Sequence, residues 1–245
     1  MKNIYKKNGI SYIDTLDSYS KTPLLILHGW QQDKESWMDV IDIIKKDYRV
    51  ICLDLPNFGN SKHEKFLSLG VDEYAELIEA LLKRLHIDTV NILAHSFGGR
   101  IAIKISASKN IKVHSLILFS SAGIISEKRK LKKYIYTKFP KKIIPQKIRE
   151  QMRSNDYKNA GELKEVFLKA INYNVFPLLK KISAKTLIIW GDEDKELNLK
   201  NADILNMNIK VSELSILNGY THFAHIENPY LFSGIVKNFL DKNEK

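Results

Sequence analysis

Side chains that can act as nucleophile, acid and base stand directly after short apolar runs of this sequence. Ser96 follows the run 90–94 and precedes Gly98 and Gly99. A hydroxyl becomes a nucleophile when a histidine takes its proton and a carboxylate orients that histidine. Such groups meet only if parallel strands bring their carboxyl ends to one edge of a sheet. The elements around each candidate therefore decide whether these side chains can act together.

The segment around Ser96 predicts a strand over 90–94, a sharp turn and a helix over 99–108. A serine at the apex of such a turn has a strained backbone and presents its hydroxyl above the sheet. Small residues are needed two positions before and two positions after it, and these are Ala94 and Gly98. Taken alone, the pattern A-x-S-x-G also fits a serine that only caps a helix.

Carboxylates follow a later apolar run, 186–190, which is expected to be another strand. Asp192, Glu193 and Asp194 all stand at its end, and each can serve as the acid by position. The expected strand 115–119 ends without a carboxylate, so the acid should follow the later strand.

Two histidines, His222 and His225, follow the expected strand 212–217. Each is a candidate base, and the order Ser, Asp, His along the chain is one in which catalytic triads occur. A metal site of His222, His225 and Glu227 is an alternative, although no further ligand cluster accompanies it.

Donors for an oxyanion are expected after the run 24–27, which ends in His28, Gly29 and Trp30. Glycine lets the backbone approach a substrate closely. The backbone N–H groups of Trp30 and Phe97 are the candidates. A tight turn between strand and helix is the alternative explanation of this stretch.

The order of elements predicts an α/β fold. Asn8-Gly9 predicts a hairpin of antiparallel strands at the start of the chain. Apolar runs that then alternate with amphipathic stretches indicate a mostly parallel sheet with helices on both faces. The helices are expected near 35–46, 72–86, 99–108, 127–139, 145–153, 161–171, 199–206 and 229–241.

Composition narrows the class of protein. The chain has 245 residues, of which 44% are hydrophobic, and no run approaches the roughly 18 apolar residues of a membrane span. Its beginning has no apolar block either, so a cytoplasmic location is expected. The single cysteine, Cys52, lies in an apolar run and is expected to be a buried thiol without a catalytic role.

The net charge of +11 is concentrated in one segment. Residues 121–181 hold 16 Lys or Arg against five Asp or Glu, whereas the rest of the chain is balanced. This segment interrupts the sheet pattern, which predicts a core over 1–121 and 182–245 and a basic helical insertion over 122–181.

Taken together, these motifs resemble the α/β-hydrolase superfamily over nearly the whole chain. Three further stretches carry the resemblance: Asp54-Leu-Pro-Asn-Phe-Gly-Asn-Ser61, Gly191 to Asp194, and His222 to Pro229. The resemblance assigns the acid to Asp194, the base to His222 and a lid to the basic insertion. Ala94, Asn57 and Thr221 depart from it, each replacing a glycine that is usual in the family.

The resemblance implies acyl transfer by Ser96, His222 and Asp194, without a metal or organic cofactor. The expected substrate is a small or acyl-chain ester or thioester, and the expected pocket residues are Trp30, Tyr134, Phe139 and Phe167. Two alternatives within this fold are a carbon–carbon bond hydrolase or lyase and a ligand-binding protein without activity.

The basic insertion suggests an anionic partner, because its charge would act on whatever approaches the site. His28-Gly29-Trp30 followed by Trp37 is locally similar to the pimeloyl-acyl-carrier-protein methyl ester esterases, which implies an acidic carrier protein. The alternatives are an anionic lipid surface, a substrate that carries a carboxylate or phosphate, and solvated lysines without a partner. No nucleic-acid motif accompanies the lysines, so nucleic acid is not expected as a partner.

Overall fold

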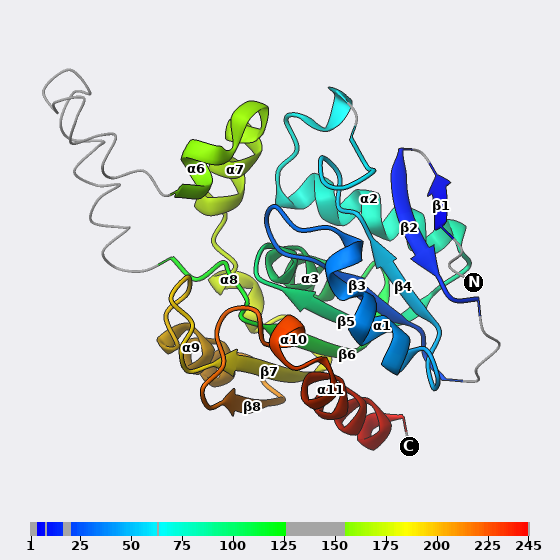
Figure 1. Cartoon of the computed structure of the whole chain (residues 1–245), viewed down its shortest axis with the longest axis vertical. Helices are drawn as coiled ribbons and strands as arrows, with labels where there is room; N and C mark the ends of the chain where they lie inside the picture. The colour runs from blue at the N-terminus through cyan, green and yellow to red at the C-terminus, as the bar shows by residue number, and fades with distance from the viewer. Residues whose placement is uncertain (1–3, 8, 17–20, 63, 126–154, 245) are drawn as a thin grey trace, which may run out of the picture.

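A computed structural model describes residues 4–7, 9–16, 21–62, 64–125 and 155–244. Its described strands form one eight-stranded sheet in the order β1-β2-β4-β3-β5-β6-β7-β8 (Figure 1). The strands are β1 Ile4–Lys7, β2 Ile10–Asp14, β3 Leu24–Leu27, β4 Val50–Leu53, β5 Thr89–His95, β6 Lys112–Phe119, β7 Lys185–Gly191 and β8 Ser212–Leu217.

The sheet begins with an antiparallel hairpin and continues as parallel strands. Lys7 pairs with Ile10, and Gly9 between them has a φ of 81°, which glycine adopts without strain. β2 runs antiparallel to β4, and all later pairs from β3 to β8 are parallel. The predicted hairpin and the mostly parallel sheet are therefore confirmed.

Helices cover both faces of the sheet (Figure 1). The described α-helices are α1 Met38–Ile44, α2 Val71–Arg84, α3 Phe97–Ser108, α6 Asn155–Asn159, α7 Lys164–Asn172, α8 Phe176–Leu179, α9 Lys200–Asn208, α10 Ala224–Glu227 and α11 Pro229–Asn243. The same part of the chain has the short 3-10 helices η1 Lys34–Trp37, η2 Glu64–Phe66 and η3 Gly161–Leu163. No helix of these described ranges is both long and apolar enough to cross a membrane.

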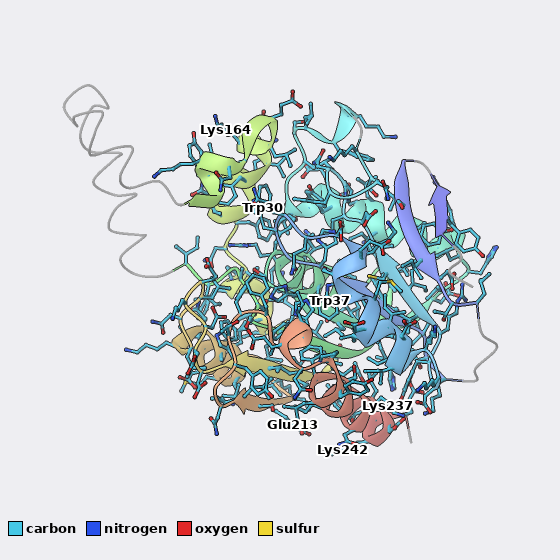
Figure 2. The ribbon with its side chains drawn as sticks, in the orientation of Figure 1. Trp30, Trp37, Lys164, Glu213, Lys237 and Lys242 are labelled. Atoms are coloured by element: carbon cyan, nitrogen blue, oxygen red, sulfur yellow. The ribbon has the colours of Figure 1, made fainter. Side chains whose placement is uncertain are left out.

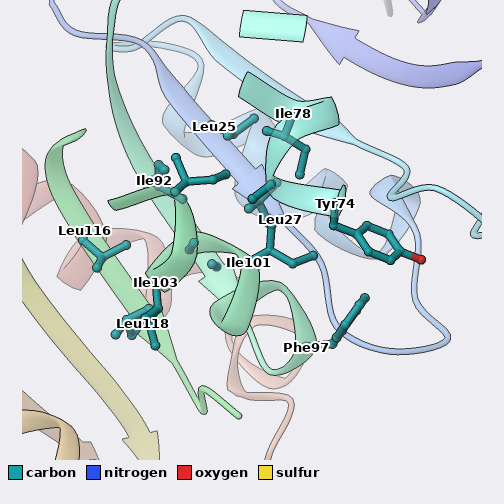
Figure 3. Close-up of a cluster of buried hydrophobic side chains, with 14 of the residues drawn as sticks. Leu25, Leu27, Tyr74, Ile78, Ile92, Phe97, Ile101, Ile103, Leu116 and Leu118 are labelled. Carbon is teal, nitrogen blue, oxygen red and sulfur yellow. The ribbon is translucent and has the colours of Figure 1, made fainter. Parts of the chain in front are cut away.

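Alternating side chains of the central strands enter two separate cores. Leu25 and Leu27 of β3 pack in one core, with α2 and α3 (Figure 3). Leu24 and Ile26 of the same strand pack in the other, with α1 and α11. The run is apolar at every position because neither face of β3 meets water. Cys52 lies in the second core, where burial raises the pKa of its thiol, as a structural thiol requires.

The structure differs from the sequence prediction mainly in short elements. The helix expected near 35–46 is divided into η1 and α1, and the short helices α6, α8 and α10 were not predicted. The helices expected near 127–139 and 145–153 lie outside the described residues, with most of the basic segment. The division into core and lid stays a prediction.

A buried ion pair joins the loops that follow β3 and β4. Lys34 Nζ lies 2.6 Å from Asp54 Oδ2, and the two side chains are 1% and 0% exposed. Asp54 also accepts the backbone N–H groups of Lys34 and Asn60, each at 2.9 Å. The carboxylate therefore fixes the start of η1 and the turn after β4.

Replacing Lys34 with Met is expected to lower the free energy of unfolding by about 3–5 kcal/mol, because Asp54 would stay buried without its counter-charge. Urea unfolding would measure the change. The matched control is Lys45→Met, which breaks the exposed pair with Asp42 at 2.6 Å and should cost less than about 1 kcal/mol. Equal losses in the free energy of unfolding would show that the buried pair contributes no more to stability than the exposed pair.

Candidate active site

Ser96 occupies the one position between β5 and α3. It has a φ of 49° and a ψ of −109°, a backbone conformation that non-glycine residues rarely adopt. Its N–H donates to the Phe119 carbonyl at 3.1 Å, and its own carbonyl accepts the N–H groups of Gly99 and Ala122. The predicted sharp turn is confirmed, although the helix begins at Phe97, two residues earlier than expected.

Gly98 is required where α3 approaches β3. A Cβ atom at this position would lie 2.5 Å from the Leu27 carbonyl oxygen and 2.7 Å from that of His28. Any side chain would therefore push the helix away from the strand. Ala94, the other small residue of the motif, is fully buried and pairs with Leu27 across the sheet.

Asp194 is the carboxylate that meets a histidine. Its Oδ2 lies 2.7 Å from His222 Nδ1, and its Oδ1 accepts the N–H groups of Glu196 and Leu197, each at 2.9 Å. Asp192 instead accepts the N–H of Gly219. Of the three candidates, Asp194 is the one whose hydrogen bond to His222 fits the role of the acid.

The environment of Asp194 keeps it ionised. Burial raises the pKa of its carboxyl group, but hydrogen bonds from His222 and from the Leu197 N–H outweigh that effect, so the pKa lies below its usual value of 3.8. An ionised carboxylate only accepts hydrogen bonds, so Nδ1 of His222 carries the proton. In the neutral form of this ring, Nε2 is the nitrogen that can accept a proton.

The loop after β3, residues 28–33, is held by the neutral side chain of His28. Burial lowers the pKa of His28 to about 4. Its Nε2 accepts the Leu55 N–H at 2.9 Å, so its proton is on Nδ1 and is donated to the Gly29 carbonyl at 2.7 Å. Because a trans peptide is planar, the N–H of Trp30 points away from that fixed carbonyl.

Phe97 carries the second N–H group that the sequence marks as a candidate oxyanion donor. It is the first residue of α3, and the first N–H groups of a helix have no partner within the helix. Its N–H therefore lies at the positive end of the helix dipole, next to Ser96. This arrangement can stabilise negative charge on an oxygen bound beside the serine.

Ser96 and His222 line one cavity of about 540 Å³, a size typical of small-molecule sites. Aromatic side chains form much of its wall. The Trp30 ring lies 5.6 Å from that of Phe97 and 5.0 Å from that of Phe167, which α7 carries. Figure 2 places Trp30 below α7, the helix that begins at Lys164.

Two of the four predicted pocket residues, Trp30 and Phe167, therefore line the cavity. The other two, Tyr134 and Phe139, lie outside the described residues. Ala170 and Ile171 of α7 line the same wall, so an amphipathic helix of the basic segment contributes to the site.

His225 lies apart from this arrangement. It is 1% exposed and stacks on Trp37, with ring centroids 4.2 Å apart. Glu227, the third residue of the alternative metal site, accepts hydrogen bonds from Thr221. Within the described ranges, no three His, Cys, Asp or Glu side chains are placed to hold a metal ion.

Sequence reasoning missed two polar residues of the cavity, Gln32 and His95. Nδ1 of His95 lies 2.8 Å from Gln32 Oε1, and the same oxygen accepts the Gly29 N–H at 2.8 Å. The position of His95 next to Ser96 was the available signal. No pattern in the sequence marks Gln32.

The sequence has recognisable relatives. Residues 22–139 match the family described as the alpha/beta hydrolase fold. Monoacylglycerol lipase ABHD6 of Mus musculus is 23% identical over 259 residues, covering 90% of this chain and 76% of that protein. YugF, an uncharacterized hydrolase of Bacillus subtilis (strain 168), is 24% identical over 256 residues, covering 94% of this chain and 93% of YugF.

Solved structures share the same arrangement of elements. A membrane phospholipase A, described as a bacterial virulence factor, is similar with a TM-score of 0.76 at 22% identity, covering 99% of this chain and 86% of that chain. The sheet order, the turn at Ser96 and the matched family all agree. The chain therefore has the α/β-hydrolase fold, and its residues 22–139 match the family of that name.

Proposed function

We propose that this protein is a serine hydrolase that cleaves the ester bond of an acyl substrate through Ser96, His222 and Asp194. The observation that carries the proposal is the 2.7 Å hydrogen bond between Asp194 and His222 at a cavity that Ser96 also lines. These three residue types in this relation are the parts of an activated serine nucleophile.

In the first half of the reaction, Ser96 Oγ forms a bond to the ester carbonyl carbon while its proton moves to His222 Nε2. Asp194 stabilises the positive charge that develops on the His222 ring. The N–H groups of Trp30 and Phe97 donate to the oxyanion. The intermediate collapses, the proton passes to the leaving alcohol, and an acyl-enzyme on Ser96 remains.

In the second half, a water molecule gives a proton to His222 and attacks the acyl-enzyme. The same N–H donors stabilise the second oxyanion, and Ser96 recovers its proton as the carboxylic acid leaves. Each step uses a side chain of this chain and the two substrates, the ester and water.

One part of the cavity favours an apolar acyl group. Trp30, Phe97 and Phe167 line that part, and apolar surface of this kind binds hydrocarbon. Gln32, Arg100 and Glu196 line the remainder with polar groups. The names of two relatives, a monoacylglycerol lipase and a phospholipase A, support a fatty acyl ester as the substrate class. A thioester fits the same chemistry.

Hydrolysis of p-nitrophenyl esters from acetate to decanoate would test the proposal. Each added methylene is expected to raise kcat/KM up to about fourfold until the apolar wall is covered, since a buried CH₂ contributes about 0.8 kcal/mol. In the matched variant Phe167→Ala, this dependence on chain length should weaken. A fluorophosphonate probe should label the wild type at Ser96, and a protein that neither hydrolyses any ester nor takes the label would contradict the proposal.

A further inference from the structure

His95 lies between the two loops that the proposed reaction must hold in a fixed relation. One is residues 28–33, called here the oxyanion loop, and the other is residues 218–223, called the base loop. Nδ1 of His95 lies 2.8 Å from Gln32 Oε1 in the first loop. Nε2 lies 2.9 Å from the carbonyl oxygen of His222 in the second.

The contact with the oxyanion loop is tight. Gln32 Oε1 accepts the Gly29 N–H at 2.8 Å while it faces His95. A Cβ atom at Gly29 would lie 2.7 Å from Gln32 Oε1 and 2.8 Å from His95 Nδ1. The peptide that presents the Trp30 N–H therefore packs directly against the imidazole of His95.

The contact with the base loop is equally close. The rings of His95 and His222 lie 4.6 Å apart, and the His95 ring stacks on Phe119 at 4.7 Å. His95 is 1% exposed and directly precedes Ser96. A side chain so placed cannot move without displacing the nucleophile turn, the oxyanion loop or the base loop.

We propose that His95 is a positioning residue that fixes the His222 base and the oxyanion loop relative to each other across Ser96. This inference rests on the proposed function, which assigns roles to those two loops. In this proposal His95 acts through its contacts with Gln32 and the His222 carbonyl.

The proton on His95 gives this link a spectroscopic signature. Burial, together with the neighbouring His222 and His225, lowers the pKa of His95 well below its usual value, so the ring is neutral at pH 7. A neutral imidazole has one N–H but here faces two oxygen acceptors. It therefore donates to Gln32 in one tautomer and to the His222 carbonyl in the other.

The kinetic test compares His95→Phe with His225→Phe. Phenylalanine keeps an aromatic ring at position 95 and removes both nitrogens, and with them the polar contacts to Gln32 and to the His222 carbonyl. His225 is equally buried and its ring nitrogens have no hydrogen-bond partner among the described residues. Activity would be expressed per active site titrated with a phosphonate ester, so that misfolded protein does not lower the apparent kcat.

We expect kcat of His95→Phe to fall roughly 10- to 100-fold with KM within about threefold, because small misplacements of reacting groups cost factors of this size. His225→Phe should keep kcat within about threefold. Gln32→Leu should also lower kcat. The double variant should be no less active than the less active of the two single variants, because both substitutions break the same link between the oxyanion loop and the base loop. Full kcat in His95→Phe, or independent effects of the two substitutions, would overturn the inference.

Nitrogen-15 spectra of the histidine rings provide a test that needs no turnover. In Gln32→Leu the acceptor at Nδ1 is lost, so His95 is expected to shift toward the tautomer that donates from Nε2. Unchanged ring shifts in that variant would overturn the inference. If the wild type proves inactive, the proposed function fails, while these spectra still decide whether His95 links the two loops.

Discussion

Ser96→Ala is expected to lower kcat for p-nitrophenyl octanoate by roughly 10⁵- to 10⁶-fold, close to the background rate. Alanine removes the only atom that forms the bond to the acyl group in the proposed reaction. The remaining donors and His222 can still bind the ester and polarise it, which leaves a small residual rate. Steady-state kinetics would measure the loss of kcat and the residual rate, and mass spectrometry would show whether the protein is still acylated.

Ser106→Ala is the matched control for this substitution. Ser106 lies on the same helix, α3, and is also buried, but it does not line the cavity. This variant should keep kcat within about twofold and still be acylated at Ser96. If Ser96→Ala retained substantial turnover, another nucleophile would have to carry the reaction.

Local signals in the sequence predicted those parts of the fold that depend on few residues. Asn8-Gly9 predicted the hairpin because a two-residue turn requires backbone conformations that Gly9, with its φ of 81°, adopts readily. The apolar run 24–27 predicted a strand covered on both faces, and its side chains do alternate between two cores. Each of these features follows from a few neighbouring residues.

The candidate site could be predicted only in part, since its residues come from loops far apart in the chain. Their positions after the expected strand did not show which of Asp192, Glu193 and Asp194 is the acid. Only the resemblance to the family pointed to Asp194. His222 and His225 were not distinguished by spacing either. In the structure, His225 falls within α10 and is buried on Trp37, whereas His222 stays in the preceding loop beside the cavity.

The contacts of Gln32 and His95 could not be predicted from the sequence. They depend on how the oxyanion loop and the base loop pack on either side of β5, and no periodic pattern encodes that packing. His95 stood next to the predicted nucleophile, yet its acceptors are 63 and 127 residues away in the chain. Such links follow only from the folded arrangement.

Asp194→Asn is expected to lower kcat about 10⁴-fold, because an asparagine amide can donate to His222 Nδ1 and so favour the tautomer that has its proton on Nε2. That tautomer cannot accept the proton of Ser96. The neighbouring variant Asp192→Asn is the matched control, since Asp192 bonds to the Gly219 N–H and not to His222. A loss of kcat in Asp192→Asn instead would move the role of the acid to that residue.

Asp194→Asn should also change how the stability of the protein depends on pH. The pKa of Asp194 is lowered in the folded protein, so its carboxylate contributes stability above the unfolded value of about 3.9. That contribution is lost as the pH falls below about 4 and through the lower folded pKa. Thermal unfolding between pH 7 and pH 3 should therefore show a steeper acid decline in the wild type than in Asp194→Asn. Parallel curves would mean that the bond between Asp194 and His222 does not stabilise the ionised carboxylate, and the argument for Asp194 as the orienting acid would fail with it.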